Sequence, residues 1–304
     1  MKAQRRGRPQ AGLDAQLLAF GALVGGSLAM GASPIFVRLA EVGPYTSAFW
    51  RVALALPALW LWARLEERGR PAAALAKEAR PWIALAGLLF AGDLIFWHLA
   101  IVHTSVANAT FLATLAPVWV VLGSGLVLGE AITGRIVGGL ALGLLGAVLL
   151  MGADLRVAPQ QLVGDLYGVI TSVFFGAYFL AVRRARRACG TGRMLFLSSS
   201  VTAAILLVAA LVIEDRMWPA AAGGVAALVA LALVSHSGGQ GLLAYALGHL
   251  PAAFSAIVVF LEGVAAAALG WLVLGEAMGP LQFAGAGAIF AGIAIARPRR
   301  DVAP

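Results

Sequence analysis

The chain of 304 residues is 61% hydrophobic and only 12% charged, with a mean hydropathy of +0.91. A soluble domain of this length needs more polar surface to cover its core, so the composition indicates a protein that lies in the lipid bilayer. The net charge of +8 does not indicate a nucleic-acid partner, because the basic residues lie at the ends of apolar segments, and the single cysteine excludes an intramolecular disulfide.

Ten apolar segments follow one another along the chain, each close to the ~20 residues that a helix needs to cross a bilayer. None of them alternates apolar and polar residues as the strands of a membrane barrel do. The sequence therefore predicts an all-α integral membrane protein with ten transmembrane helices. The expected spans are 15–38, 45–65, 81–103, 105–128, 133–152, 164–185, 194–213, 223–248, 252–274 and 280–297.

The chain contains an internal duplication, because the hexapeptide Leu-Val-Leu-Gly-Glu-Ala stands at 126–131 and again at 272–277. We expect two repeats of five spans each, covering 1–155 and 156–304. Because five is an odd number, the second repeat is inverted in the membrane, which is a common design for alternating access. Further matches at the same offset are Ala100 with Ala246, His103 with His249, Ala107 with Ala253 and Leu115 with Leu261.

The Lys and Arg residues cluster in alternate connections between the spans. Most of them lie before the first span, between 64 and 80, between 183 and 193, and after 296. By the positive-inside rule these connections face the cytoplasm, so both termini are expected there. The expected location is the inner membrane of a cell, with the lipid bilayer as a partner.

Three stretches of the chain follow a known family pattern: Phe49-Trp50-Arg51, Ala116-Pro117-Val118 leading to Gly129-Glu130, and Leu261-Glu262-Gly263-Val264 leading to Gly275-Glu276, where Gly263 departs from the proline often found at its position. With these stretches the chain resembles the drug/metabolite transporter superfamily in its ten-helix form with two EamA domains. The resemblance covers nearly the whole chain and implies a transporter of amino acids, including aromatic ones, or of related metabolites. The family contains exporters, importers and exchangers.

Two carboxylates lie in the middle of predicted spans, where an ionisable group costs roughly 2.5–3.5 kcal/mol to insert. Asp93 has Trp97 one helical turn away, and His98 is five residues on. Glu262 is followed by Gly263, which permits a kink or a close backbone approach. Each acid is a candidate to bind a substrate ammonium group or to carry a proton. The alternative for each is a hydrogen bond to a neighbouring helix that serves packing alone.

The eighth and first spans contain residues that weaken a helix. Ser235–Gly241 is the most polar and glycine-rich stretch of any span, and its His236 and Gln240 share a face. This pattern favours a cavity wall, and tight helix packing is the alternative. In the first span, Pro34 removes a backbone hydrogen bond next to Ser33, which predicts either a gating hinge or a static kink.

Hydroxyl, amide and aromatic side chains supply the remaining candidates for substrate contact. Polar groups inside spans form hydrogen bonds either with substrate or between helices. Aromatic rings suit an apolar or aromatic substrate. The polar set is Asn108, Thr110 and Thr114, and the aromatic set is Trp50, Trp97, Tyr178 and Tyr245.

Charged residues near the span ends have simpler interpretations. Arg51 lies under two turns inside the second span, so we expect its side chain to reach the outer surface, although it is also placed to attract an anionic group. Glu130 and Glu276 end their spans in the repeated hexapeptide. We expect these two carboxylates to bond a turn or the start of the next helix.

These features predict a secondary transporter that moves a small metabolite, foremost an amino acid, outward by alternating access without a cofactor or a metal. Coupling to protons and uncoupled transport are both compatible with the sequence. An intramembrane enzyme is disfavoured, because Gly92-Asp93 resembles the signature of membrane aspartyl proteases but Phe90 replaces the required glycine. A membrane scaffold would not need ionisable groups at this depth.

Overall fold

The computed structural model describes residues 8–68, 75–104, 106–151, 158–275 and 278–298. Every regular element within these ranges is a helix. Among the described residues, nine helical segments are long and apolar enough to cross a bilayer, and Pro280–Ala296 is a shorter apolar helix. The prediction of an all-α membrane protein with ten spans in two inverted repeats is confirmed.

Several spans consist of two or more consecutive helices. The first repeat contains α1 (Arg8–Met30), α2 (Ser33–Leu39), α3 (Pro44–Ala53), α4 (Leu56–Glu66), α5 (Ala79–His103), α6 (Val106–Ala113), α7 (Ala116–Gly123), a π-helix (Ser124–Leu128) and α8 (Gly134–Met151). The second repeat contains a 3₁₀ turn (Pro159–Gln161), α9 (Leu162–Ala185), α10 (Thr191–Ile213), α11 (Ala222–Ala230), a π-helix (Leu231–Gln240), α12 (Gly241–Leu247), α13 (Ala252–Val258), α14 (Leu261–Leu274) and α15 (Pro280–Ala296).

The first span breaks between α1 and α2, where the sequence predicts a weak helix. Pro34 stands in the first turn of α2, where its missing N–H group costs nothing. At Gly31 a Cβ atom would lie 2.7 Å from the carbonyl oxygen of Glu262 and 2.6 Å from the Cβ of Ala265. Only glycine therefore permits the close approach of α1 to α14 at this depth.

The glycine of the repeated hexapeptide has the same conformation in both copies, although the first copy ends a π-helix and the second an α-helix. Gly129 and Gly275 both adopt the left-handed conformation, with φ of 70° and 71°, and each ends its span as a C-cap. A left-handed residue turns the chain away from the helix axis, and glycine adopts it without steric cost. Glu130 follows this turn directly, whereas Glu276 lies outside the described residues.

Two glutamates clamp the second and seventh spans together at both ends. The Glu214 carboxylate, at the end of α10, accepts the N–H groups of Tyr45 (2.8 Å) and Thr46 (2.9 Å) at the start of α3. Glu66, at the end of α4, accepts in turn the N–H groups of Thr191 and Gly192 at the start of α10, both at 2.9 Å. Each carboxylate satisfies helix N–H groups that have no partner inside their own helix.

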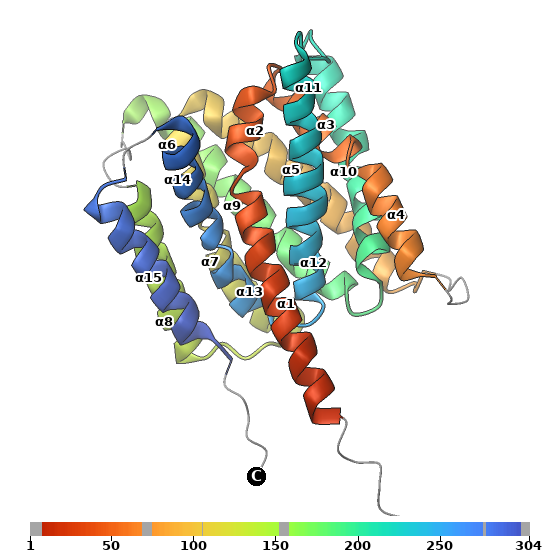
Figure 1. The fold of residues 1–304 in the computed structure, drawn as a ribbon, viewed down its shortest axis with the longest axis vertical. Helices are drawn as coiled ribbons and strands as arrows, with labels where there is room; N and C mark the ends of the chain where they lie inside the picture. Colours follow the sequence, from red (N-terminus) through yellow and green to blue (C-terminus); the bar gives the residue numbers. More distant parts are fainter. Residues whose placement is uncertain (1–7, 69–74, 105, 152–157, 276–277, 299–304) are drawn as a thin grey trace, which may run out of the picture.

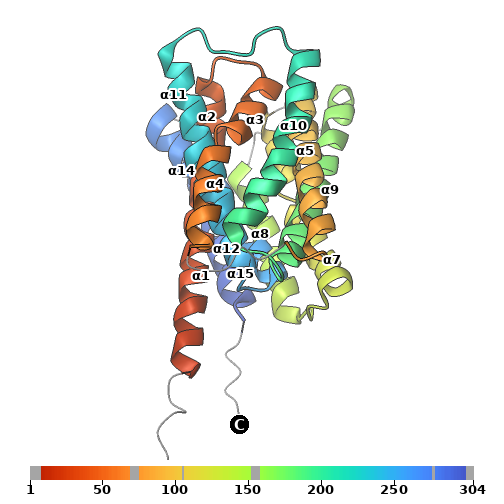
Figure 2. The ribbon, with the colours of Figure 1, turned by 90° about the vertical axis from the view of Figure 1, so that its right-hand side faces the viewer.

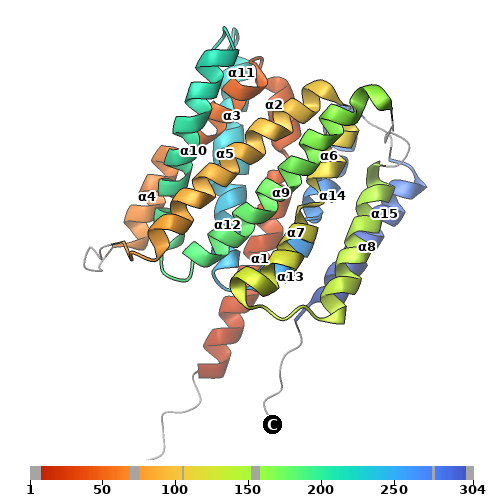
Figure 3. The same cartoon turned by 180° about the vertical axis from the view of Figure 1, so that it is seen from behind.

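The helices form an elongated bundle with a pair of packed helices at each flank. α8 packs against α15 at one flank, and α4 packs against α10 at the other (Figure 1, Figure 3). α1 begins and α15 ends at the same end of the bundle (Figure 2). α6 lies near the opposite end, and α13 lies near the end where α1 begins (Figure 1). The interrupted spans thus meet in the middle, between the flanks.

Candidate functional site

A cavity of about 150 Å³ lies where the interrupted helices meet. Its wall comes from the break between α1 and α2, the middle of α5, the breaks between α6 and α7 and between α13 and α14, and the end of the second π-helix. Interrupted helices at membrane depth expose backbone groups that only a cavity or neighbouring protein can satisfy. The location is therefore typical of a substrate site in a repeat-built membrane protein.

Three ionisable side chains line this cavity, and each comes from a different span. Arg51 lies on α3, Asp93 on α5 and Glu262 on α14. Arg51 and Asp93 are both only 9% exposed. The wall thus presents one cation and two carboxylates in a medium of low dielectric constant, where charges act strongly on one another and on a ligand.

The hydrogen-bonding capacity of these groups is not used up by the protein. The Nε of Arg51 is buried and has no hydrogen-bond partner among the described residues, and the guanidinium lies 6.0 Å from the centre of the Phe90 ring. Within the described part of the chain, the carboxylates of Asp93 and Glu262 take part in no hydrogen bond and no salt bridge. Buried charges normally have partners, so the unpaired set points to a ligand that supplies them.

The rest of the wall combines aromatic rings with hydroxyl groups. Phe90, Trp97 and Phe175 supply the rings. Thr171 donates from its hydroxyl to the backbone carbonyl of Asp93 at 3.3 Å, which ties α9 to α5 beside the acid. Thr110 and Thr114, which the sequence marked as candidates, also lie at the wall together with Ser33, Pro34 and Gln240.

Six of the sequence-predicted site residues therefore lie together at the cavity: Ser33, Pro34, Asp93, Trp97, Gln240 and Glu262. The other five lie outside its lining and contact protein groups instead. His98 contacts the carbonyl oxygen of Leu94 through its Nδ1 (2.5 Å). Asn108 donates from its side-chain amide to Asp165 at 3.1 Å. Sequence spacing placed these two near the cavity but did not determine which way their helices are rotated.

The remaining predicted site residues that lie outside the cavity lining are Tyr178, His236 and Tyr245. Tyr178 stands behind the wall and donates from its hydroxyl to the Oε1 of Gln240 at 3.2 Å. The Nε2 of His236 contacts the hydroxyl of Ser199 on α10 at 2.9 Å, so the imidazole ties two helices together. Tyr245 stacks on His249, with ring centres 4.6 Å apart. Of these three, only Tyr178 contacts a residue of the cavity wall through a hydrogen bond.

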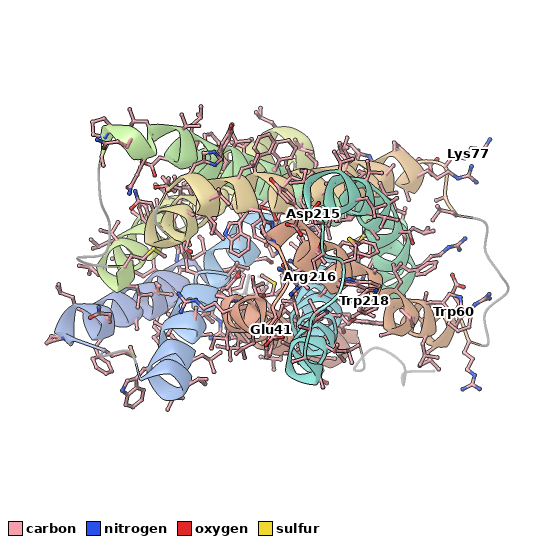
Figure 4. All side chains as sticks on the ribbon, turned by 90° about the horizontal axis from the view of Figure 1, so that it is seen from above. Glu41, Trp60, Lys77, Asp215, Arg216 and Trp218 are labelled. Carbon is pink, nitrogen blue, oxygen red and sulfur yellow. The ribbon has the colours of Figure 1, made fainter. Side chains whose placement is uncertain are left out.

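The expected aromatic wall is not a single surface. Trp50 donates from its indole to the carbonyl oxygen of Met217 at 2.7 Å and packs on Trp218, with ring centres 4.1 Å apart. Trp218 lies with Asp215 and Arg216 over the end of the bundle (Figure 4). Trp50 on α3 therefore packs against the connection after α10, which covers this end of the bundle. Of the four predicted aromatic residues, Trp97 is the one at the cavity wall within the described residues.

The sequence also did not reveal the orientation of the Arg51 side chain. The expectation that it reaches the outer surface is wrong, because α3 buries the face that carries Arg51 and Val52. Its nearness to a predicted span end favoured snorkelling, and the clamp by Glu214 holds this short helix inside the bundle instead. Phe90, Thr171 and Phe175 carried no signal in the sequence, since such residues are ordinary in apolar spans.

The described residues contain no cluster of three His, Cys, Asp or Glu side chains that could hold a metal ion. At the end of the bundle near α13, outside the spans, burial raises the pKa of the Cys189 thiol and lowers the pKa of Arg186. Arg186 donates to the carbonyl oxygens of Ala244 (3.0 Å) and Cys189 (2.5 Å). These contacts hold the connection after α9 against the end of α12.

A multi-pass bundle of two inverted repeats around a charged central cavity has the architecture of a membrane transporter. The profile of the EamA-like transporter family matches residues 17–152 and again 162–297. The chain therefore belongs to the EamA-like transporter family, a branch of the drug/metabolite transporter superfamily.

Individual relatives agree with this assignment. The pseudopaline exporter CntI from two strains of Pseudomonas aeruginosa is 31% identical over 216 residues, which cover 70% of this chain and 73% of that protein. An uncharacterised transporter of Archaeoglobus fulgidus is 32% identical over 152 residues, which cover 47% of this chain and 50% of its own. A protein of known crystal structure superposes with a TM-score of 0.78 at 22% identity, over 93% of this chain and 96% of its own, and thus shares the fold.

Proposed function

We propose that this protein exports a small zwitterionic metabolite, of the amino-acid type, from the cytoplasm across the inner membrane. The observation that carries the proposal is a set of one cation and two carboxylates at one cavity in the middle of the bundle, for which the described residues supply no hydrogen bond to the charged groups and no salt bridge. A molecule with both a carboxylate and an ammonium group complements this set. Arg51 faces the carboxylate, and Asp93 and Glu262 face the ammonium group.

The size and lining of the cavity support a small substrate with an apolar part. Its volume of about 150 Å³ is below the roughly 300–1,000 Å³ of pockets that hold drug-sized ligands. Phe90, Trp97 and Phe175 offer ring faces to an apolar side chain or to the ammonium group. The related pseudopaline exporter supports outward transport of a metabolite, and the inverted repeats support alternating access.

The test is uptake of pooled labelled amino acids, and then of other zwitterions, into proteoliposomes with and without a pH gradient. Asp93→Asn removes one carboxylate charge from the cavity and is expected to reduce saturable uptake by about tenfold or more, since hydrogen bonds to charged groups contribute about 1.5–3 kcal/mol. The matched control is Asp14→Asn, at an exposed position on α1, which is expected to transport as the wild type does.

A response to the pH gradient would make protons the coupling ion, and equal rates with and without the gradient would make the protein a facilitator. Saturable uptake that Asp93→Asn leaves unchanged would contradict the proposed site. Uptake of neutral sugars or organic acids in preference to zwitterions would contradict the proposed substrate class. Movement only of substrate supplied from the side where the termini lie would establish outward transport.

A further inference from the structure

The two ends of the cavity are closed to very different degrees. Every residue of α13 is buried, from Ala252 to Val258. The corresponding helix of the first repeat is α6, because Ala107 matches Ala253. In α6 only Asn108 and Ala109 are buried among the residues whose burial is described, and the following four are half-buried. The inverted repeats place α6 and α13 toward opposite ends of the bundle (Figure 1).

This difference in burial indicates that the cavity is more closed at the α13 end than at the α6 end. From α6 the cavity wall includes Thr110 and Ala113. From the ninth span it includes Val259, Phe260, Glu262 and Gly263, all of which lie beyond α13. α13 packs against α7 near the end of the bundle where α1 begins, and this packing is the seal of that end. Alternating access requires this seal to open in the opposite state.

A polar network holds the seal at its outer edge. The Oε2 of Glu130 accepts the N–H groups of Ala252 (2.8 Å) and Ala253 (3.4 Å), the first residues of α13. Its Oε1 accepts from the Nε of Arg183 at 3.2 Å. Arg183 also donates through Nη1 to the carbonyl oxygen of Leu247 at 2.7 Å, at the end of α12. Glu130 is the one member of this network that belongs to the first repeat.

The geometry suits a contact that forms and breaks. The left-handed turn at Gly129 ends the fourth span and directs Glu130 across to the second repeat. The side chains of Arg183 and Glu130 are 19% and 14% exposed, so water reaches both partners. A salt bridge at the edge of solvent is weakly stabilising, and its two charges are readily hydrated when it separates. A fully buried pair would leave uncompensated charges on opening.

We propose that Glu130 and Arg183 form a latch that keeps the α13 end of the cavity closed, and that breaking this salt bridge lets α13 move away from α7. The proposal rests on the proposed function only in that transport requires both ends of the cavity to open in turn. The closed state itself is measurable without any substrate. Failure of the latch and failure of the proposed function are therefore distinguishable.

The experiment measures the rate at which a maleimide labels a cysteine placed at Ser255, which is fully buried on α13. The full-length chain carries Cys189→Ser, which removes its single native thiol. With the latch intact, labelling of the Ser255→Cys variant is expected to be slow. Glu130→Ala and Arg183→Gln are each expected to accelerate it by about tenfold or more. The double variant should add little to either, because both changes break one contact.

The matched control is Glu66→Ala. Glu66 also accepts two backbone N–H groups at the start of a helix of the other repeat, but it clamps α10 at a flank of the bundle. This change is expected to leave Ser255→Cys labelling unchanged. A second probe is Thr110→Cys, on the open side of the cavity, in the same Cys189→Ser chain. The maleimide should label it when the latch is intact, and breaking the latch should leave its labelling rate unchanged or lower it.

Two outcomes would overturn the latch. One is labelling of Ser255→Cys that neither Glu130→Ala nor Arg183→Gln changes. The other is acceleration by Glu66→Ala to the same extent, which would mean a general loosening of the fold. Should Glu130→Ala fail to fold, as judged by size-exclusion chromatography, Glu130→Gln takes its place, since it keeps an acceptor and removes the salt bridge. Accelerated labelling without uptake of any zwitterion would support the latch and contradict the proposed function.

Discussion

At the scale of single residues, Arg51 is the group that we propose binds the carboxylate of the substrate. Its side chain is buried at the wall, and in the part of the chain that the structure describes its Nε has no hydrogen-bond partner. Arg51→Gln is expected to raise the KM for a transported zwitterion by about tenfold or more, because it removes a charge-assisted hydrogen bond. Arg51→Lys should recover only part of this loss, since it restores the charge without the planar fork. The measurement is concentration-dependent uptake into proteoliposomes.

A methyl ester of the same substrate provides the control for this prediction. The ester lacks the carboxylate, so the wild type should bind it weakly and Arg51→Gln should change its KM little. An equal loss for acid and ester would show that Arg51 acts on the fold and not on the carboxylate.

Tyr178 acts on the cavity through another residue. Its hydroxyl donates to the Oε1 of Gln240, which is a residue of the cavity wall. Tyr178→Phe keeps the ring contacts with Phe90 (4.9 Å) and Phe175 (5.9 Å) and removes the donor. We expect a two- to tenfold rise in KM at an unchanged maximal rate, in line with about 0.5–1.5 kcal/mol for a neutral hydrogen bond.

Tyr167→Phe is the matched control, because Tyr167 contacts Phe96 and His103 away from the cavity wall. Its KM is expected to equal that of the wild type. A fall in thermal stability with no change in KM for Tyr178→Phe would assign Tyr178 to packing alone.

The sequence identified Asp93 and Glu262 because a carboxylate inside an apolar span stands out regardless of the helix rotation. The same reasoning placed His98 and His236 at the site, whereas both contact neighbouring protein groups instead. The direction of a side chain depends on the rotation of its helix about its axis. In spans that are apolar on every side, no stripe of hydrophobic residues reveals that rotation.

At the scale of helices, the pairing of α8 with α15 depends on glycines whose neighbours are very close. A Cβ on Gly139 would lie 2.6 Å from the Cβ of Ala296 and 2.6 Å from the carbonyl oxygen of Gly292. A Cβ on Gly138 would have only the Cγ2 of Ile295 near it, at 3.9 Å. Gly139→Ala is therefore expected to push the helices apart and lower the melting temperature in detergent by several degrees.

Gly138→Ala is the adjacent control and is expected to leave the melting temperature unchanged or slightly higher. Alanine is favoured over glycine in a helix by up to about 1 kcal/mol. At this position its Cβ would have only the Cγ2 of Ile295 near it, at 3.9 Å, which is an ordinary contact distance. A loss of stability for Gly138→Ala as large as that for Gly139→Ala would mean that helix packing does not distinguish the two positions.

The interruptions of the spans were predictable only in part. Gly31, Pro34 and the stretch 235–241 carry glycine or proline, and the structure breaks or widens the helix at these places. The ninth span also breaks, between Val258 and Leu261, where Val259 and Phe260 carry no such signal. Contacts with the rest of the bundle create this interruption, and local sequence does not record them.

At the scale of the whole molecule, the duplication predicted the inverted architecture but not the contacts that join the repeats. Glu66, Glu130 and Glu214 stand at span ends, where a charged residue is ordinary. The expectation that Glu130 bonds a nearby turn or the next helix is wrong, since it reaches α13 in the other repeat. Such pairings join residues more than a hundred positions apart, which spacing along the chain does not reveal.

The orientation in the membrane is the property on which the direction of transport depends. If the termini are cytoplasmic, the connection after α10 and the open end of the cavity near α6 both face outward (Figure 1). In intact cells of a Cys189→Ser strain, we expect a membrane-impermeant maleimide to label Asp215→Cys and Thr110→Cys. It should label Lys77→Cys only after the cells are permeabilised. Asp215 and Lys77 are both exposed, so a difference between them reports sidedness rather than burial (Figure 4).

The three cysteine positions test separate parts of this expectation. Labelling of Lys77→Cys but not Asp215→Cys in intact cells would reverse the orientation and place the latch outside. Labelling of Asp215→Cys without Thr110→Cys would keep the orientation and show that the cavity is shut at the α6 end. Protection of Thr110→Cys by a transported zwitterion would link that residue to the substrate path, because Thr110 lies at the cavity wall.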